Sequence, residues 1–408
     1  MRYGSLCSGI GGFDAGFDAA GFTAAWQVEI DPKARQVLTR HWPAAKRYTD
    51  MRNVGGQNLE PVGIILGGTP CQSFSISGLR KGLSDERGNL TFEFCRICDE
   101  LQPRIIVWEN VPGVLSSTDN AFGAFLAGLV GADAPLVPPE SAGGRWTNAG
   151  VVSGPRRAAA WCIKDAQFFG TPQRRRRVFV VASPDPQLPA QILFESNRVC
   201  GDHSAGNEAR EGFAAAFGGG SETGRGPGDG DDGGRDGSEI GGERGCLTPW
   251  DMERFRVHSA AGVVPPLLAN TNGGGQGVHT VAIEQGQLPE DATPIFKRRG
   301  GFGRSETVIR RLTPTECERL QGFPDQHTQW GIEEPPCALT GSEWTQWAAA
   351  HILQMSDSTR YKQCGNAVNV AVSTWLGWRV QMTQEELDVK RTRLQSLAED
   401  AAKEAAEL

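Results

Sequence analysis

Short apolar runs alternate with helix-like segments through the first 183 residues of the chain. The strand-like runs lie at residues 24–28, 62–66, 105–108 and 178–181, and each is followed by a loop that carries polar residues. This alternation is typical of βαβ units, in which the strands run parallel. We therefore predict an α/β fold with a mostly parallel sheet, helices on both faces, and four strand ends that direct polar side chains to one edge.

The rest of the chain departs from this pattern. Residues 201–246 contain sixteen glycines and almost no large apolar residue, which predicts a flexible insertion because such a segment buries too little surface to offset its ordering entropy. The sequence from 246 to 307 predicts a small irregular or β-rich unit. Helical signals return at Thr313, an N-cap before Pro314. The capping box at 383–386 predicts a separate, solvated C-terminal helix over 383–408.

Charge and cysteine content refine this picture. The formal net charge is −7, but residues 201–246 carry −6 and residues 383–408 carry −3, so the remainder carries +2 and a DNA partner is not excluded. No run approaches the ~20 apolar residues of a membrane span, and no signal-peptide pattern is present, so we expect a cytoplasmic protein. The ten cysteines lack disulfide spacing. The CxxC at 95–98 has no second ligand pair, so no metal site is predicted.

One cysteine stands at a position suited to chemistry. Gly67, Gly68 and Pro70 interrupt the apolar run 62–66, so Cys71 follows on a loop at the strand's carboxyl end. Ligands bind at that edge in open α/β sheets. An isolated cysteine is nevertheless more often a buried, inert residue of the core. The surrounding motifs must therefore show whether Cys71 is reactive.

Three features at neighbouring strand ends together predict a nucleoside pocket. Residues 8–13 place glycines between a strand and a helix N-terminus. Glu29 follows the second strand, where an acid typically binds the ribose hydroxyls, and Asp50 is placed to accept from an adenine amino group. The chain has no GxxxxGK[ST] motif and no complete GxGxxG motif, which disfavours ATP and NAD. A phosphate-free nucleoside beside a thiol indicates S-adenosylmethionine.

Two further motifs predict groups that recognise a heterocyclic ring. Glu109 follows apolar residues of the 105–108 strand, where desolvation favours a raised carboxyl pKa. A carboxylate that caps a helix start is the alternative interpretation. The run 173–177 enters the strand at 178–181, so the strand period of two places Gln173, Arg175 and Arg177 on one face.

In this order the motifs resemble those of the cytosine-5 DNA methyltransferases of bacterial and phage modification systems. The matching segments are Ser8–Gly12, Pro70–Gln72, Glu109–Val111, Gln173–Arg177, Arg311–Glu316, Gly322–Pro324 and Gly365–Val368. The resemblance implies a Rossmann-like, S-adenosylmethionine-dependent methyltransferase domain over 1–184 and 308–382. It also implies a target-recognition region over 185–307.

The resemblance implies a covalent mechanism. The Cys71 thiolate adds to carbon-6 of a cytosine flipped out of the duplex, and carbon-5 then attacks the methyl group. Glu109 acts on ring nitrogen 3, and Arg177 orients the cytosine carbonyl. The other implied catalytic-loop positions are Arg175, Gln72 and Ser75.

The implied cofactor-binding residues lie on several loops. They are Cys7, Gly9, Ile10, Gly11, Gly12, Glu29, Ile30, Asp50, Pro70, Leu90, Asn366 and Val368. Cys7 and Ile30 stand where the family usually has aromatic residues beside the adenine. Losing one such ring weakens binding by roughly 1 kcal/mol, the scale of an aromatic pair, so we expect cofactor binding that is weaker than typical.

The implied partner is double-stranded DNA, bound by a monomer in restriction–modification or in phage DNA protection. Candidate DNA contacts are Gln173, Lys297, Arg298, Arg299 and Arg304, and the sequence leaves open whether the basic ones touch bases or only phosphates. One alternative is the tRNA-methylating branch of the family, whose Cys-Phe-Thr signature this chain lacks. Another is a catalytically silent DNA-binding regulator, which would need neither the thiol nor the acid.

Overall fold

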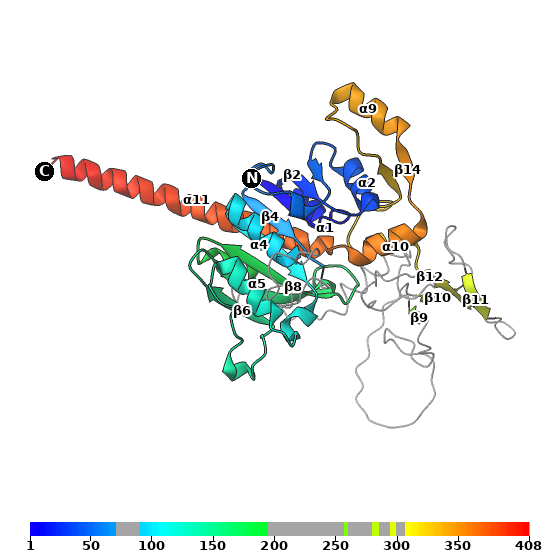
Figure 1. Cartoon of the computed structure of the whole chain (residues 1–408), viewed down its shortest axis with the longest axis horizontal. Helices are drawn as coiled ribbons and strands as arrows, with labels where there is room; N and C mark the ends of the chain where they lie inside the picture. The colour runs from blue at the N-terminus through cyan, green and yellow to red at the C-terminus, as the bar shows by residue number, and fades with distance from the viewer. Residues whose placement is uncertain (71–89, 195–256, 260–279, 285–293, 299–306, 408) are drawn as a thin grey trace, which may run out of the picture.

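An eight-stranded sheet dominates the structure, a computed structural model that describes residues 1–70, 90–194, 257–259, 280–284, 294–298 and 307–407 (Figure 1). Its order is β3-β2-β1-β4-β5-β8-β7-β6. The strands are β1 (Arg2–Leu6), β2 (Thr23–Val28), β3 (Lys46–Tyr48), β4 (Ile64–Gly67), β5 (Ile105–Asn110), β6 (Ala149–Ser153), β7 (Ala158–Asp165) and β8 (Arg176–Ser183).

The sheet is mostly parallel, as predicted. The five strands β1 to β5 run parallel, whereas β8 pairs antiparallel with both β5 and β7, and β6 pairs antiparallel with β7. The expectation that the end of the 178–181 strand lies at the same edge as the other ends is wrong, because β8 runs in the opposite direction. Its beginning, at Arg176, lies at that edge instead.

Helices cover both faces of the sheet, which confirms the predicted layers. The alternation of side chains along β5 divides the core. Ile106 and Trp108 pack with α4 (Leu90–Leu101) and α5 (Ala121–Val130). Ile105 and Val107 belong to the core shared with α1 (Gly12–Ala19), α6 (Leu188–Leu193) and α11 (Val370–Glu407). Each such apolar side chain contributes about 1.5–3 kcal/mol when fully buried.

Shorter elements complete the described chain. They are α2 (Pro32–His41), η1 (Met51–Asn53), η4 (Pro112–Ser116), η5 (Glu140–Ala142), η6 (Ala166–Phe168), α8 (Pro314–Leu320), β13 (Trp330–Ile332), α9 (Gly341–Ala350), β14 (Ile352–Gln354) and α10 (Asp357–Asn366). The predicted cap of α8 is confirmed. The Glu316 amide donates to Thr313 Oγ1 at 3.3 Å, and the Thr313 amide donates to the Glu316 carboxylate at 2.7 Å.

A smaller four-stranded sheet begins in the region predicted to be irregular or β-rich and extends past its predicted end at 307, because the last strand runs to Arg311. It consists of β9 (Val257–Ser259), β10 (Thr280–Glu284), β11 (Pro294–Arg298) and β12 (Thr307–Arg311), in the order β11-β12-β10-β9. The glycine-rich segment 201–246 lies outside the described residues.

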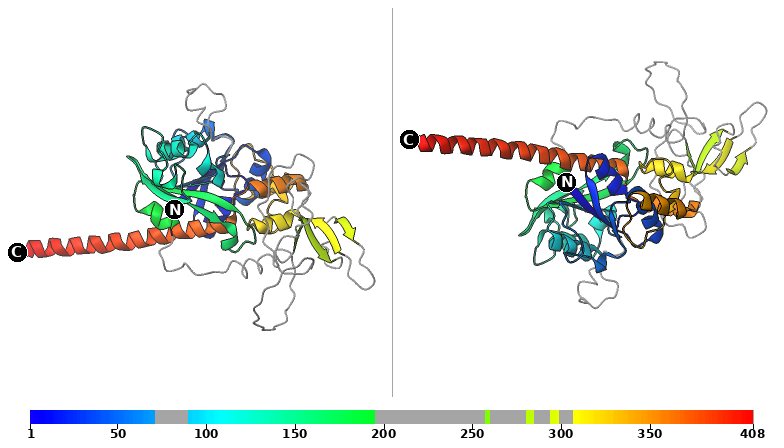
Figure 2. Two further views of the ribbon diagram at one scale, coloured as in Figure 1. Left: turned by 90° about the horizontal axis from the view of Figure 1, so that it is seen from below. Right: turned by 90° about the horizontal axis from the view of Figure 1, so that it is seen from above.

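The predicted helix start at Thr383 is wrong. Residues 370–407 form one continuous helix, α11, and Thr383 Oγ1 donates to the Arg379 carbonyl within it. The first part of α11 packs on α1 and α6, and the C-terminal part extends away from the other described elements (Figures 1 and 2). Among the described residues, no helix combines the length and the apolar character needed to cross a membrane.

Candidate active site

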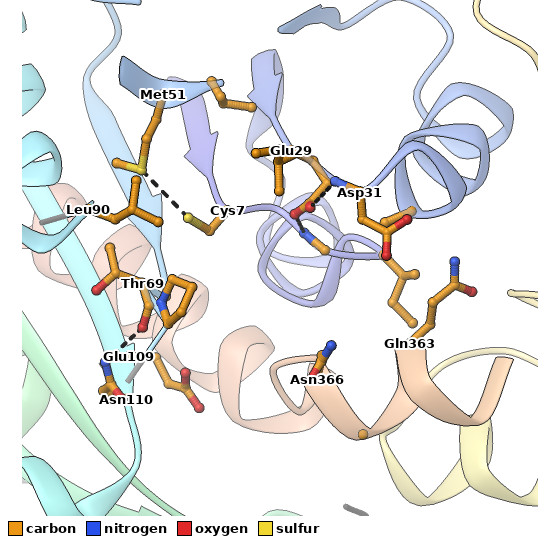
Figure 3. A pocket seen from close by; sticks show the side chains of 18 of the residues that line it. Cys7, Glu29, Asp31, Met51, Thr69, Leu90, Glu109, Asn110, Gln363 and Asn366 are labelled. Carbon is orange, nitrogen blue, oxygen red and sulfur yellow. Dashed lines mark hydrogen bonds between the residues drawn. The ribbon is translucent and has the colours of Figure 1, made fainter. Parts of the chain in front are cut away.

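A cavity of about 400 Å³ lies at the sheet edge where β1, β2, β4 and β5 end (Figure 3). The predicted site residues that line it are Cys7, Gly9, Ile10, Glu29, Ile30, Asp50, Pro70, Leu90, Glu109, Arg175, Arg177 and Asn366. Segments far apart in the sequence therefore meet at one place. Cys71, Gln72 and Ser75 lie outside the described residues, and the described chain reaches Pro70 on the cavity wall.

Glu29 holds the glycine loop at the end of β1. Its Oε2 accepts from the Gly9 amide at 2.7 Å, and its Oε1 accepts from the Asp31 amide at 2.8 Å. Burial raises the pKa of this carboxyl, and the two backbone donors oppose that rise. Each carboxylate oxygen has a second lone pair, so Glu29 remains able to accept from a ribose hydroxyl.

Asp50 has a partner that the sequence did not indicate. Its carboxylate forms an ion pair with Arg52 at 2.6 Å and accepts from the Arg52 amide at 2.9 Å, which caps η1. Hydrogen bonding to Arg52 holds the pKa of Asp50 below its usual range. Asp50 is therefore an ionised acceptor, but an adenine amino group would share it with Arg52.

Cys7 lies in the interior wall of the cavity. Its backbone has a φ of 53°, and its Sγ lies 3.7 Å from Met51 Sδ. Burial, followed by the charges of Glu29 and Asp50, raises the pKa of the Cys7 thiol to about 12. Cys7 is thus a neutral thiol near neutral pH. It packs in the cavity wall and is not a nucleophile.

Glu109 and Arg177 form the charged pair at the other end of the cavity. Glu109 lies opposite Phe179 in the β5–β8 ladder, and the Arg177 Nε lies 3.0 Å from Glu109 Oε1. Burial raises the pKa of Glu109, while Arg177 and then Arg175 oppose the rise. The predicted direction of this pKa shift is confirmed. A carboxyl poised in this way is suited to share a proton with a ring nitrogen.

The predicted alternation along 173–177 is also confirmed. Arg174 and Arg176 are exposed, whereas Gln173 and Arg175 are buried and Arg177 is half-buried. Arg175 donates from Nη2 to the Ala367 carbonyl at 2.7 Å, and burial lowers its pKa to about 9. The Gln173 carboxamide has no partner among the described residues. The predicted DNA contact at Gln173 therefore requires that this side chain leave its buried position.

Asn110 joins the ends of β4 and β5. Its Nδ2 donates to the Thr69 carbonyl at 2.9 Å, and its Oδ1 accepts from the Val111 amide at 2.8 Å. Thr69 Oγ1 also accepts from Trp108 Nε1 at 3.1 Å. These bonds fix the chain immediately before Pro70 (Figure 3). Asn110 lies in the Glu109–Val111 segment that carries the family resemblance, but the sequence alone did not indicate this structural role.

Other predicted residues lie off the cavity wall. Gly12 packs against the segment after α10, since an added Cβ would lie 2.3 Å from the Val368 carbonyl oxygen. Gly11, Gly12 and Val368 thus shape the packing behind the cavity instead of lining it. Lys297 and Arg298 lie on β11, with only their backbone described, and Arg299 and Arg304 lie outside the described residues.

The cavity wall includes residues that sequence reasoning missed. They are Asp31, Thr49, Met51, Thr69, Asn110, Lys362 and Gln363, among others. Gln363 could have been found, because it lies three residues before Asn366 on a helix and shares a face with it. Asp31 likewise follows Glu29 directly in a matched strand-end segment.

The mostly parallel sheet, the strand-end acids Glu29 and Asp50, and the Glu109–Arg177 pair at one sheet edge fit an S-adenosylmethionine-dependent methyltransferase. A sequence model described as C-5 cytosine-specific DNA methylase matches residues 1–130 and 269–381. The chain belongs to this family.

Two relatives illustrate the match. The Type II methyltransferase M.NgoPII of Neisseria gonorrhoeae is 36% identical over 356 residues, which cover 80% of this chain and 86% of that protein. A DNA N-6-adenine-methyltransferase of Escherichia phage P1 is 33% identical over 478 residues, which cover 93% of this chain. The chain spans 61% of the phage protein's length.

Solved structures share the fold at low identity. The Entamoeba histolytica methyltransferase EhMeth has a TM-score of 0.54 and 15% identity, over 93% of this chain and 97% of that chain. The S. pombe Dnmt2 methyltransferase has a TM-score of 0.53 and 15% identity, over 94% and 99%. These likenesses show the fold alone.

Proposed function

We propose that this protein methylates carbon-5 of a cytosine in double-stranded DNA, as part of a DNA modification or protection system. One observation carries the proposal. The Glu109–Arg177 pair shares a cavity with Pro70, the residue before Cys71, and with the proposed nucleoside acids Glu29 and Asp50. An acid for the ring and a site for the methyl donor thus lie in one cavity.

The cavity residues fit S-adenosylmethionine as the methyl donor. Met51 and Leu90 provide apolar contacts for an adenine beside the Asp50 acceptor, and Glu29 provides acceptors for ribose hydroxyls. The bound cofactor supplies an electrophilic methyl group.

The protein's residues would activate the cytosine ring. The Cys71 thiolate adds to carbon-6, which breaks the aromaticity and makes carbon-5 nucleophilic. Glu109 donates to ring nitrogen 3 and Arg177 to the carbonyl oxygen, so both stabilise the electron density that the thiolate delivers. After methyl transfer, a base removes the carbon-5 proton and the thiolate leaves. The target base must be flipped out of the duplex for these contacts to form.

The decisive experiment measures transfer of a tritiated methyl group from the cofactor to unmethylated duplex DNA. Wild-type protein should label the DNA, Cys71→Ser should not, and Cys337→Ser, which changes an exposed cysteine away from the cavity, should retain activity. DNA with 5-fluorocytosine should trap a covalent adduct, because the fluorine cannot leave as a proton does. Transfer by Cys71→Ser at the wild-type rate would defeat the covalent mechanism.

The name of the phage P1 relative favours one second candidate, methylation of the adenine N6 amino group. Nucleosides from the labelled DNA, separated by mass spectrometry, distinguish the two products. We expect 5-methylcytosine, because Glu109 and Arg177 present a donor pair suited to N3 and the carbonyl of a cytosine. Label found only in N6-methyladenine would replace our proposal with this second one.

A further inference from the structure

His327 is a buried histidine that contacts the glycine loop of the cavity from behind. It is 4% exposed and lies in the segment that follows α8. Its Nε2 lies 2.8 Å from the Ile10 carbonyl oxygen, in the loop after β1. Because a carbonyl oxygen only accepts, the Nε2 atom carries the proton and donates. Ile10 is among the described residues that line the cavity, whereas His327 lies behind them.

The Ile10 carbonyl depends on this donor. Gly11 is the N-cap of α1, and its carbonyl accepts from the Ala15 amide at 2.8 Å, which begins the bonds of the helix. The Ile10 carbonyl lies one residue earlier, outside that series. Buried backbone carbonyls are nearly always paired in folded proteins, and His327 provides the partner here.

The loop is held at two neighbouring residues by groups from distant segments. The Gly9 amide donates to the Glu29 carboxylate, and the Ile10 carbonyl accepts from His327. Gly9 and Gly11 have φ angles of 58° and 85°. Glycines regain more conformational freedom than other residues when they are released. Loss of either bond should therefore let the loop leave the conformation in which Gly9 and Ile10 line the cavity.

Aromatic neighbours fix the His327 ring. It stacks on His41 with 4.0 Å between the ring centroids, and on Phe323 with 4.3 Å between them. His41, the last residue of α2, has its Nε2 2.9 Å from the His327 carbonyl oxygen, and it donates for the same reason. Burial lowers the pKa of His327 to about 3, so the ring is neutral near neutral pH. A neutral ring has one N–H donor, and the Ile10 carbonyl determines that it is on Nε2.

We propose that His327 is a positioning residue for cofactor binding, because its Nε2–H holds the Ile10 carbonyl and thereby keeps residues 9–11 in the shape that receives the cofactor. His327 acts through the loop and does not touch the cofactor. This role rests on the proposed function, in which the loop binds S-adenosylmethionine.

Three substitutions separate the hydrogen bond from the stacking. His327→Phe keeps a ring and removes the donor. His327→Gln removes the ring and places an amide nitrogen as many bonds from Cβ as Nε2, whereas the amide nitrogen of His327→Asn takes the place of Nδ1. Calorimetry with S-adenosylhomocysteine should show affinity about three- to tenfold weaker for the Phe and Asn variants, the range for one net hydrogen bond. The Gln variant should bind within about twofold of wild type.

Steady-state kinetics distinguish positioning from a general loss of folded protein. In His327→Phe, the KM for the cofactor should rise by about the same factor, while kcat at saturating cofactor stays within about twofold. A smaller amount of folded protein lowers the apparent kcat and leaves KM unchanged.

The matched control is His351→Phe. His351 also stacks on an aromatic ring, with 3.6 Å between its centroid and that of Trp347, and its Nδ1 lies 2.9 Å from the Trp347 carbonyl oxygen. It lies at the end of α9, away from the glycine loop. This control should leave both the affinity and the KM for the cofactor unchanged.

Several outcomes would overturn this role and leave the proposed function standing. They are wild-type affinity in His327→Phe, an affinity in His327→Gln as weak as in His327→Asn, and a fall in kcat at an unchanged KM. If His327→Phe does not fold, the comparison of His327→Gln with His327→Asn decides. If wild-type protein does not bind S-adenosylhomocysteine, the proposed function itself fails.

Discussion

Asn110 should be essential for positioning the catalytic loop, and a single-atom change can test this. Asn110 is 4% exposed, and its Nδ2 donates to the Thr69 carbonyl while its Oδ1 accepts from the Val111 amide. Asn110→Asp preserves the shape and the bond to Val111. It replaces the donor to Thr69 with a second acceptor, so the tie between the ends of β4 and β5 is lost.

The expected magnitude follows from the lost bond. A buried acceptor left unpaired costs about 1–3 kcal/mol. If that energy holds Pro70 and the following Cys71 in place opposite Glu109, its loss slows methyl transfer by roughly 5- to 150-fold, at a factor of ten per 1.36 kcal/mol. Cofactor affinity should change little, because Glu29 and Asp50, the proposed nucleoside ligands, are held by separate bonds to the Gly9 and Arg52 amides.

The assay is single-turnover methyl transfer at saturating DNA and cofactor, measured at pH 8 and at pH 6. Burial favours the protonated form of the introduced carboxyl, which can donate to the Thr69 carbonyl. The defect of Asn110→Asp should therefore shrink at the lower pH, relative to wild type. Asn148→Asp, at an exposed position before β6, controls for the added charge. A wild-type rate for Asn110→Asp at pH 8, or a parallel loss of cofactor affinity, would refute the reasoning.

Two further predictions concern buried carboxyl groups. Asp14 is fully buried, accepts from Ser5 and Gln27, and has its pKa raised by burial to about 7. Because the folded pKa lies above the unfolded value, its stabilising contribution is full below about pH 4 and is lost as the pH rises through about 7. Asp14→Asn should therefore remove from the free energy of unfolding a pH-dependent contribution on the order of 4 kcal/mol. If urea unfolding gave wild type and Asp14→Asn the same change in free energy of unfolding with pH, the prediction would be contradicted. In Gly68→Ala, the new Cβ would lie 3.2 Å from Glu109 Oε2. The Glu109 carboxylate should then shift away from Arg177. Because Arg177 lowers the pKa of Glu109, the limb of the pH–rate profile that reports Glu109 should move to higher pH. A limb at the same pH in wild type and Gly68→Ala would contradict this prediction.

Local sequence patterns were sufficient to place the acids and arginines of the site. Glu29 and Glu109 follow apolar strands, and the strand period of two orders Gln173, Arg175 and Arg177 without any long-range information. The direction of β8 was not predictable in this way. An apolar run does not show which way its strand runs, and the antiparallel ladder of β8 with β5 places the arginines at the cavity edge at the beginning of the strand.

Two other features depend on tertiary contacts. The sequence at 383–386 matches a capping box, but helix-forming residues precede Thr383. Because the first part of α11 packs on α1 and α6, the helix forms before Thr383 and continues through it. That the buried Gln363 carboxamide has no hydrogen-bond partner among the described residues could likewise not be predicted from the sequence, because it depends on which distant segments pack around α10.

Separate hydrogen bonds hold the two ends of the cavity. At the end where we propose that the nucleoside binds, the carboxylates of Glu29 and Asp50 accept from backbone amides. At the Glu109 end, Asn110 donates to the Thr69 carbonyl and accepts from the Val111 amide. Arg175 Nη2 donates to the Ala367 carbonyl at 2.7 Å and to the Gly365 carbonyl at 3.3 Å, so it joins the Glu109 end to the segment on either side of Asn366, a proposed cofactor-binding residue. Changes at Asn110 should therefore separate chemistry from cofactor binding, whereas changes at Arg175 must disturb both.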